Sequence, residues 1–352
     1  MIVGKNAQGK TSILEALSLL TQLRSFKTRD NSELILMGKN QASISAEIVK
    51  PTYNQVVIGL ESKKRTCIRI GEKKISSKAD YDFLGSSVSF IPDDLYLVKG
   101  GPENRRDFMN QLAMNLDPQS VVNYQQFQKS LKQRNNLLKQ FKEMRGNEEQ
   151  LQLWNEKYIE SAVKIYEQRH QLVQDLREFL PQVYLELFSV SESIDFQYDH
   201  GFDSDCPSKE EIYQKIQRLS QAEKAVGYSL CGPHRDDFCF SLEKKKARHF
   251  ASQGQTRSLV VALKIAQLEL SKKLRRWSPI LLLDDIVSEF DESRTEAFVH
   301  YLAQYSGQMF VSTAEVNKLK NLHQQFSSFK LIDLSFKPLL EEQSSSKFAF
   351  PA

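Results

Sequence analysis

The chain has 352 residues, of which 40% are hydrophobic and 26% charged. These proportions are ordinary for a globular protein, exclude a disordered or collagen-like chain, and suggest roughly two domains. No apolar run approaches the roughly 18 residues that a membrane span requires, and no signal peptide is recognisable. Because the four cysteines show no CxxC spacing, we expect neither a zinc site nor disulfides, and a cytoplasmic location.

The net charge of +4 is unevenly distributed along the chain. Residues 104–145 carry eight Lys and Arg against three acidic residues, and residues 243–276 carry ten against two. Two such basic stretches suit a phosphate-backbone partner such as DNA. Solvated helix faces would give the same pattern, so charge alone leaves both interpretations open.

The first predicted elements are a helix over residues 11–23, an antiparallel β portion, and a helix over residues 103–116. Apolar residues recur at helical spacing in the first helix, whereas residues 42–91 alternate and are rich in β-formers. Strands are expected over residues 43–48, 56–60, 67–70 and 88–91.

A change of pattern begins at residue 119 and lasts to about residue 180. Apolar residues fall there on a heptad-like stripe, in two runs separated by Gly146-Asn147. This pattern predicts two long antiparallel helices, a hairpin inserted into the surrounding domain. A plain helical bundle domain remains an alternative.

Strands and helices alternate after residue 225, which predicts a parallel sheet covered by helices. The expected strands span residues 236–242, 279–284, 308–313 and 329–334, and the expected helices span residues 255–276, 292–305 and 315–326.

A phosphate-binding loop is predicted at the start of the chain. The segment Gly4-Lys5-Asn6-Ala7-Gln8-Gly9-Lys10-Thr11 fits the pattern G-x-x-x-x-G-K-[ST]. Glycines let backbone N–H groups close around phosphate oxygens, and the following helix directs its N-terminal dipole at the anion. Lys10 can reach the β- and γ-phosphates of ATP, and the Thr11 hydroxyl can bind Mg²⁺. We expect the Lys10 side chain to be exposed before nucleotide binds. The alternative is a glycine turn that only caps a helix.

A second part of the site is expected near the other end of the chain. The apolar run over residues 280–283 is typical of a strand buried on both faces, and it ends in Asp284-Asp285. Ligands of open α/β sheets bind at this end of the strands. Asp284 would hold Mg²⁺, and Asp285 would orient and deprotonate the attacking water. Acidic residues that merely cap the next helix are the alternative.

Further candidate phosphate contacts come from Ser252-Gln253-Gly254-Gln255, which opens a long predicted helix. Ser252, Gly254 and Gln255 would bind the γ-phosphate of a nucleotide held by a second copy of the chain, with Ser252 contributing to catalysis. An ordinary N-cap by Ser252 is the alternative. Ser312-Thr313 comes after the apolar residues 309–311 of another predicted strand and is the candidate γ-phosphate sensor, with Thr313 as a nucleotide contact. His234 is a second polar candidate, although a lone histidine is more often structural.

Taken together, these motifs resemble the RecF family, which belongs with the SMC proteins among the ABC-type ATPases. The loop at residues 4–11 matches a Walker A motif. Mild departures from the family pattern are Phe290, Thr256 and Asn110. The other similar segments are residues 91–95 with 99–108, residues 232–238 running into 252–255, and residues 282–285 with 288–291.

The resemblance implies an α/β fold: an ABC-ATPase-like head with a parallel sheet and an antiparallel β portion, plus an inserted helical-hairpin arm. The head would comprise residues 1–100 and 226–340, the arm residues 101–225, and a flexible tail residues 341–352. It also implies a homodimer that forms with ATP and binds single- and double-stranded DNA at gaps and junctions. Slow ATP hydrolysis, cooperation with RecR, and indirectly with RecO and RecA, and a role in DNA repair, replication and the SOS response are implied as well.

Two other functions are compatible with the motifs. One is the ATPase subunit of another ABC-type complex, such as a transporter, but the Ser-Gln-Gly-Gln variant and the long helical insertion argue against it. The other is a DNA-binding scaffold that does not hydrolyse ATP. The presence of Lys10, Thr11, Asp284 and Asp285 argues against that scaffold.

The short segment before the phosphate loop is unusual. Only Met1-Ile2-Val3 precede Gly4, whereas a strand normally has about five or six residues. This predicts a chain truncated at its N-terminus, with an unpaired sheet edge beside the loop and weak ATP binding.

Overall fold

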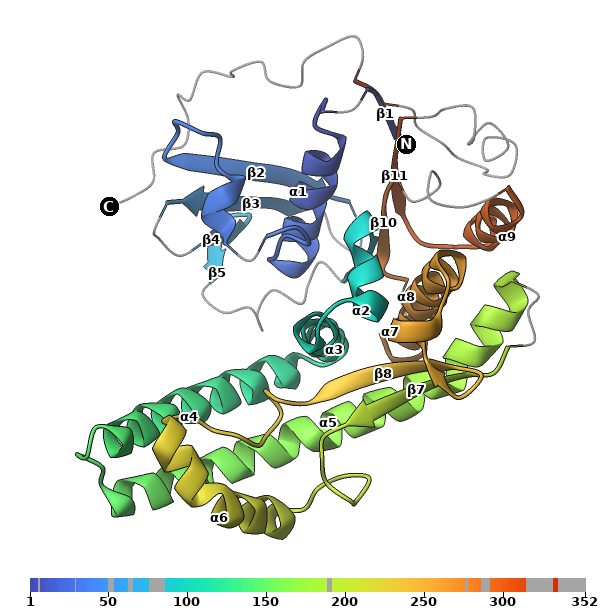
Figure 1. Cartoon of the computed structure of the whole chain (residues 1–352). Coiled ribbons are helices and arrows are strands. Elements are labelled where there is room, and N and C mark those ends of the chain that lie inside the picture. The colour runs from blue at the N-terminus through green and yellow to red at the C-terminus, as the bar shows by residue number, and fades with distance from the viewer. Residues whose placement is uncertain are drawn as a thin grey trace.

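The computed structural model describes residues 1–5, 7–28, 30–49, 54–62, 66–75, 86–188, 192–275, 278–285, 292–314 and 332–334. It has an upper part that contains a parallel and an antiparallel sheet, and an elongated lower part made mainly of long helices (Figure 1). Among these residues, no helix is both long and apolar enough to cross a membrane.

The parallel sheet has the strand order β12-β1-β11-β10-β6. Its strands are covered on both faces, as the continuous apolar run in β10 predicts. Leu282 packs with Leu14 of α1 (Lys10–Gln22), while Leu281 and Leu283 face the other way, into the cluster that includes α8 (Gln253–Arg275). The strands are β1 (Ile2–Val3), β6 (Ser87–Phe90), β10 (Ile280–Asp284), β11 (Met309–Thr313) and β12 (Ile332–Asp333).

Strand β1 has a partner on each side, so the expectation of an unpaired sheet edge beside the phosphate loop is wrong. Ile2 pairs with Ser312 of β11 and with Ile332 of β12. Residues 332–334 supply the second neighbour: the N–H groups of Ile332 and Leu334 donate to the carbonyls of Met1 and Val3, each at 2.8 Å. A two-residue strand is therefore held as an interior strand of the sheet.

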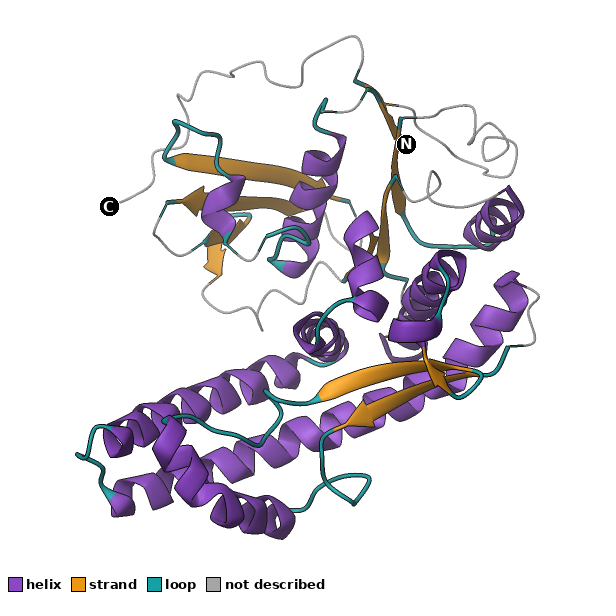
Figure 2. Ribbon diagram, viewed as in Figure 1, coloured by secondary structure: helices purple, strands orange, loops and turns teal. Residues whose placement is uncertain are grey.

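The antiparallel sheet lies beside α1 and confirms the predicted β portion in three of its four strands (Figure 2). Side chains of β3 pack against Leu19 and Leu20 of α1. The strand expected over residues 88–91 is the exception, because it forms β6 and pairs in parallel with β10. The sheet consists of β2 (Gln41–Ile48), β3 (Asn54–Glu61), β4 (Cys67–Ile70) and β5 (Lys73–Ile75).

The predicted helical hairpin is present as α4 (Pro118–Lys142) and α5 (Glu148–Phe188). Asp117 caps α4 by accepting a hydrogen bond from the Gln119 N–H at 2.9 Å, with proline at the first helical position. The 41-residue α5 continues past the hairpin and packs along α8. Two further helices complete this region, α3 (Pro102–Leu116) and α6 (Lys209–Val226).

A third, antiparallel sheet joins chain segments on either side of α6. It consists of β7 (Ile194–Asp199), β8 (Asp237–Leu242) and β9 (Lys245–Lys246). The strand expected over residues 236–242 was placed in the parallel sheet, and this is wrong, because β8 pairs antiparallel with β7. Since β7 lies in the predicted arm and β8 in the predicted head, one sheet connects the two. The division into head and arm stays a prediction.

The remaining elements are short, apart from α9 (Glu292–Ala303). The helix expected over residues 315–326 and the tail from residue 341 lie outside the described residues. The short elements are η1 (Asn31–Leu34), η3 (Pro92–Leu95), α2 (Tyr96–Lys99) and α7 (Ala247–Phe250).

Several residues of the two basic stretches are buried in ion pairs. Arg134 of α4 pairs with Glu223 of α6 at 2.5 Å, with 1% and 0% of the two side chains exposed. Arg105 pairs with Asp237 at 2.7 Å, and its side chain is 5% exposed. These cations hold the interior together, so the count of basic residues overstates the positive charge at the surface.

Candidate functional site

Three polar side chains meet at the carboxyl edge of the parallel sheet. The Thr11 hydroxyl, at the start of α1, donates to Asp284 Oδ2 at 2.9 Å. The Ser312 hydroxyl donates to Asp284 Oδ1 at 2.5 Å, and Ser312 and Asp284 are also paired in register between β10 and β11. A carboxylate beside a hydroxyl is an all-oxygen donor set of the kind that suits a hard cation such as Mg²⁺. Thr11 and Asp284, predicted as metal ligands from opposite ends of the sequence, are thus brought together.

The loop between β1 and α1 requires glycine at position 9 for its backbone conformation and leaves little room for a side chain at position 4. Gly9 has φ of 88°, in the left-handed region where a side chain is strained. A Cβ on Gly4 would lie 2.4 Å from Gln8 Oε1 and 3.2 Å from Leu334 Cβ. Ala7 is also left-handed, with φ of 65°, while Asn6 lies outside the described residues. The loop conformation therefore follows the glycine spacing of the motif.

The side chain of Lys10 crosses back over the loop. Its Nζ donates to the Gly4 carbonyl at 2.7 Å and to the Lys5 carbonyl at 3.0 Å. Lys10 is only 7% exposed, so the expectation of an exposed side chain is wrong. An ammonium near the loop is attracted to the carbonyls that line it, and an incoming phosphate would replace these carbonyls as its acceptor.

Asp285 and Thr313 lie next to this cluster. Asp285 has φ of 50°, and its backbone N–H donates to the Ser312 carbonyl at 3.2 Å. Thr313 is buried and is paired in register with Val3. Of the two polar residues that end β11, Ser312 is the one whose hydroxyl bonds to Asp284. In the sequence, Ser312 is recognisable only as a polar residue at the carboxyl end of a strand. The role of Thr313 stays a prediction.

Ser252 occupies the N-cap position of α8. Its Oγ accepts from the Gln255 N–H at 3.1 Å, and Gln255 Oε1 accepts from the Ser252 N–H at 2.8 Å. This reciprocal arrangement is a capping box, so Ser252 does cap its helix, and its side chain is exposed. Gly254 is adjacent to Arg294, because a Cβ there would lie 3.0 Å from Arg294 Nη1.

Within one chain, the Ser252 segment and the phosphate loop lie apart. Helix α8 begins directly after α7, whereas α1 begins at the loop that follows β1, well away from α7 (Figure 1). The Ser252 segment is therefore separated from the phosphate loop of its own chain, as expected if it acts on a nucleotide that is held by a second copy.

The segment at residues 231–236 is clamped by α5. Tyr158 donates to the Cys231 carbonyl at 2.7 Å, and Arg169 donates to the Pro233 carbonyl at 2.6 Å and to Asp236 Oδ2 at 2.9 Å. A Cβ on Gly232 would overlap Tyr158 Oη at 1.6 Å. This segment, which carries part of the family resemblance, thus fastens the end of β8 to the helical hairpin.

His234 lies in the same clamp and is structural. Its Nε2 lies 3.2 Å from the Ser229 carbonyl, and its ring packs near Phe127 and Tyr158. Burial lowers the pKa of His234 to about 4. The ring is therefore neutral at pH 7 and donates from Nε2 to the Ser229 carbonyl.

This low pKa predicts a loss of stability in mild acid. The unfolded chain takes up the His234 proton below its ordinary pKa of about 6.5, whereas the folded chain does so only near pH 4. The contribution of His234 to stability is therefore nearly complete at pH 7 and falls by up to about 2 kcal/mol between pH 7 and pH 5. The His234→Gln variant should lose this part of the dependence in urea unfolding at the two pH values. An unchanged dependence would show that His234 is not buried in its neutral form.

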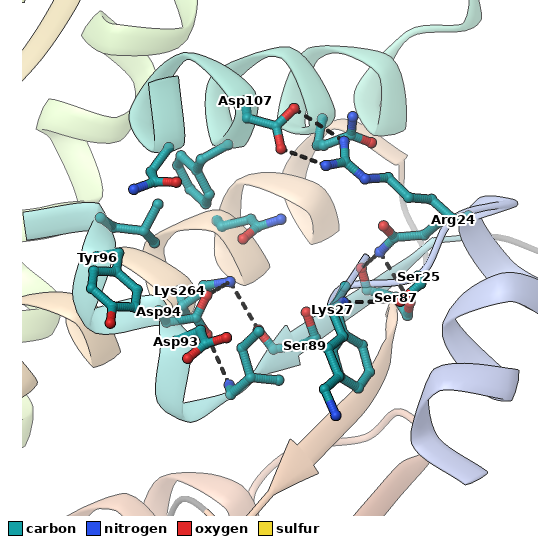
Figure 3. Close-up of a pocket in the computed structure, with 18 of the residues that line it drawn as sticks. Arg24, Ser25, Lys27, Ser87, Ser89, Asp93, Asp94, Tyr96, Asp107 and Lys264 are labelled. Carbon is teal, nitrogen blue, oxygen red and sulfur yellow. Dashed lines mark hydrogen bonds and ion pairs between the residues drawn. The ribbon is translucent and has the colours of Figure 1, made fainter. Parts of the chain in front are cut away.

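A cavity lies beside β6, an edge strand of the parallel sheet, and beside the last residue of α1, at the opposite end of that helix from the phosphate loop (Figure 3). Two ion pairs lie in its wall: Lys264 pairs with Asp94 at 2.7 Å, and Arg24 Nη1 donates to Asp107 Oδ1 at 3.1 Å. Lys264 also donates to the Ser89 carbonyl of β6 at 2.9 Å. Asp94 and Asp107 belong to the segments that carry the family resemblance, and here they tie η3 and α3 to α8 and to the loop after α1.

Three features define an ATPase head of the ABC and SMC type: a parallel sheet with a phosphate loop after β1, an acidic residue at the end of β10, which is the next strand but one from β1, and a serine-capped helix that lies apart from that loop. The model of the RecF/RecN/SMC N-terminal domain matches residues 1–332. The chain belongs to the RecF family of DNA replication and repair proteins.

Relatives and solved structures agree with this membership. The DNA replication and repair protein RecF of Oceanobacillus iheyensis is 34% identical over 345 residues, which are 95% of this chain and 92% of that protein. RecF of Geobacter sp. (strain M21) is 32% identical over 322 residues, 90% and 86% of the two chains. The structure of the recombination mediator protein RecF with ATP, in the RecFOR pathway, superposes with a TM-score of 0.82 at 26% identity and covers 89% of this chain and 85% of that one.

The likeness extends to SMC heads in fold alone. The structure of an Smc head bound to the winged-helix domain of ScpA has a TM-score of 0.51 at 11% identity and covers 94% of this chain and 85% of that one. The expected mixture of a parallel sheet, an antiparallel sheet and a long helical insertion is thereby confirmed.

Proposed function

We propose that this chain is an ATP-dependent DNA-binding protein of recombinational repair and replication, whose ATP-bound dimer binds DNA and which hydrolyses ATP slowly. The observation that carries the proposal is the meeting of Thr11, Asp284 and Ser312 at the carboxyl edge of the sheet, directly beside the Lys10 loop. The structure of RecF with ATP, which has a closely similar fold, supports ATP as the nucleotide.

Each residue of the site has a proposed task. Backbone N–H groups of residues 4–9 surround the phosphates, and Lys10 moves from the two loop carbonyls to the β- and γ-phosphates. Thr11 and Asp284 would hold Mg²⁺, which supplies charge neutralisation for the phosphates. Asp285 accepts the proton of the attacking water. Ser312 orients the Asp284 carboxylate through their hydrogen bond.

The dimer follows from the separation of the two phosphate-directed segments. An exposed Ser252 at the N-terminus of a 23-residue helix presents N–H groups and a hydroxyl to an anion. Because its own chain's loop lies elsewhere, we assign Ser252, Gly254 and Gln255 to the γ-phosphate held by the second copy. A symmetric pair of chains would then bury two nucleotides between them.

DNA binding is proposed to use the basic residues that remain at the surface. Lys129, Lys132, Lys139 and Lys142 are exposed on α4, and Lys244 to Lys246 are exposed close to the start of α8. Both single- and double-stranded DNA suit such contacts, which are mainly electrostatic. The relative described as a recombination mediator of the RecFOR pathway supports RecR as a direct partner, RecO and RecA as indirect partners, and action in the cytoplasm.

A single substitution tests the dimer and its link to DNA. In Ser252→Arg, a long cation replaces the hydroxyl at the proposed interface, so we expect ATP binding by the monomer to stay within about twofold, while ATP-induced dimers and ATP-stimulated DNA binding are lost. Light scattering and an electrophoretic mobility shift, each with and without ATP, measure the two effects.

Ser208→Arg is the matched control for this substitution. Ser208 is also an exposed N-cap in a capping box, formed with Glu211 at the start of α6. This variant loses the same helix cap but should keep the dimer and DNA binding. ATP-stimulated DNA binding by Ser252→Arg at the parent's level would contradict the proposed function.

A further inference from the structure

The N-terminus of α8 is connected to α5 by a chain of side-chain hydrogen bonds. Gln255 Nε2 donates to Glu192 Oε1 at 2.7 Å. The Tyr184 hydroxyl, near the end of α5, donates to the other oxygen of the same carboxylate, Glu192 Oε2, at 2.8 Å. Since Gln255 is also the capping partner of Ser252, only two side chains separate Ser252 from Tyr184.

Glu192 determines which way the Gln255 amide faces. A carboxylate can only accept hydrogen bonds, so it selects the NH₂ end of the amide and leaves the oxygen to accept from the Ser252 N–H. If the amide turned over, its NH₂ group would face the Ser252 N–H, and the capping box would be lost. The carboxylate is also favourably placed near the positive end of the α8 dipole.

Tyr184, at one end of this series of hydrogen bonds, is fixed to the arm. Tyr184 is 2% exposed, and burial, with the Glu192 carboxylate as the next contribution, raises the pKa of its hydroxyl well above the ordinary value. The hydroxyl is therefore always a donor to Glu192. It lies on the helix that forms one half of the hairpin and then packs along α8.

We propose that Glu192 is a positioning residue that holds the Ser252 segment in the geometry needed for ATP-dependent dimerisation and couples it to helix α5 of the arm. This inference rests on the proposed function, because it assigns Glu192 a role at the proposed dimer interface. A displacement of α5 relative to α8 changes the Tyr184–Glu192 bond and, through Gln255, the orientation of Ser252.

Three variants separate the steps of this coupling. Glu192→Ala removes both hydrogen bonds, of which the one from Gln255 orients the Ser252 segment. The loss of that one hydrogen bond to a charged group should raise the protein concentration for half-maximal ATP-induced dimerisation about tenfold. Glu192→Gln offers one acceptor oxygen and should restore part of this loss. Tyr184→Phe leaves the Gln255 contact intact and should lower the stimulation of dimerisation by DNA more than dimerisation itself.

ATP affinity of the monomer and melting temperature are the readouts that distinguish positioning from a general structural role. In Glu192→Gln and Tyr184→Phe, the ATP affinity should remain at the parent's value, and the melting temperature should fall by no more than a few degrees. Glu186→Ala is the matched control: it removes an exposed carboxylate from α5, the helix that carries Tyr184, and should dimerise like the parent.

The outcomes are distinct for this inference and for the proposed function. If the parent itself forms no dimer with ATP, the proposed function fails and the inference with it. If the parent dimerises and Glu192→Ala and Glu192→Gln both dimerise at the parent's concentration, the inference alone is overturned. If Glu192→Ala does not fold, Glu192→Gln and Tyr184→Phe decide, and parental dimerisation with parental DNA stimulation in both overturns it.

Discussion

Replacing Lys10 by alanine should raise the dissociation constant for ATP about 100-fold, because two charge-assisted contacts to the β- and γ-phosphates are lost. The ammonium lies within the loop and is directed at the carbonyls of Gly4 and Lys5. Phosphate oxygens carry more negative charge than these carbonyls and should replace them as acceptors. Isothermal titration of ATP in the presence of Mg²⁺ measures the effect.

A change of stability must be separated from this loss of affinity. Since Lys10 is buried in the nucleotide-free chain, its removal also leaves two loop carbonyls without this donor. The melting temperatures of variant and parent should therefore be compared without nucleotide. Lys27→Ala removes an exposed cation beyond the other end of α1 and should bind ATP like the parent. Parental affinity in Lys10→Ala would show that residues 4–11 do not hold the phosphates.

Local patterns were sufficient for most of the elements and for part of the site. The spacing of glycines predicts a loop directly before a helix, as found between β1 and α1, and the apolar run before Asp284 predicts a strand buried on both faces. Because parallel strands end at one edge of a sheet, Thr11 and Asp284 could be placed together although 273 positions separate them. Each of these inferences depends on residues that are close in sequence or on a general rule of sheet geometry.

The choice of sheet for a strand could not be predicted in the same way. Alternating residues identify β6 and β8 as strands, but the pattern does not show which strand lies beside them. Ser87 of β6 pairs with Ile280, and Asp237 of β8 pairs with Asp199, although all of α6 lies between these two residues in the sequence. Partners this distant are selected by packing of the complete chain, so both strands were assigned to the wrong sheet.

The sequence also does not show which charged side chains are buried in the fold. Arg134 and Arg105 count as surface charge in the sequence, yet each is buried against a carboxylate from another segment. Glu192 is the opposite case: nothing in its neighbourhood in the sequence distinguishes it from a solvated loop residue. Its contacts with Tyr184 and Gln255 come from two helices that meet only in the fold.

Replacing Asp285 by asparagine should lower the rate of ATP hydrolysis by a factor of about 10² to 10⁴, the usual contribution of a general base. Asparagine has nearly the same shape but accepts no proton from the attacking water. Affinity for ATP should change little, because Lys10, Thr11 and Asp284 are retained. With hydrolysis slowed, the ATP-bound dimer should last longer than that of the parent, as followed by light scattering after ATP addition.

The neighbouring carboxylate provides the control that separates the two acidic residues. Asp284 accepts hydrogen bonds from Thr11 and Ser312, so Asp284→Asn should reduce the dependence of ATP binding on Mg²⁺. Asp285 is assigned to the attacking water and not to the metal, so its variant should keep the parent's Mg²⁺ dependence. Parental turnover in Asp285→Asn would assign the proton transfer to another group. Loss of the dimer in that variant would instead place Asp285 among the groups that bind nucleotide, because a residue that acts only on water is not needed for assembly.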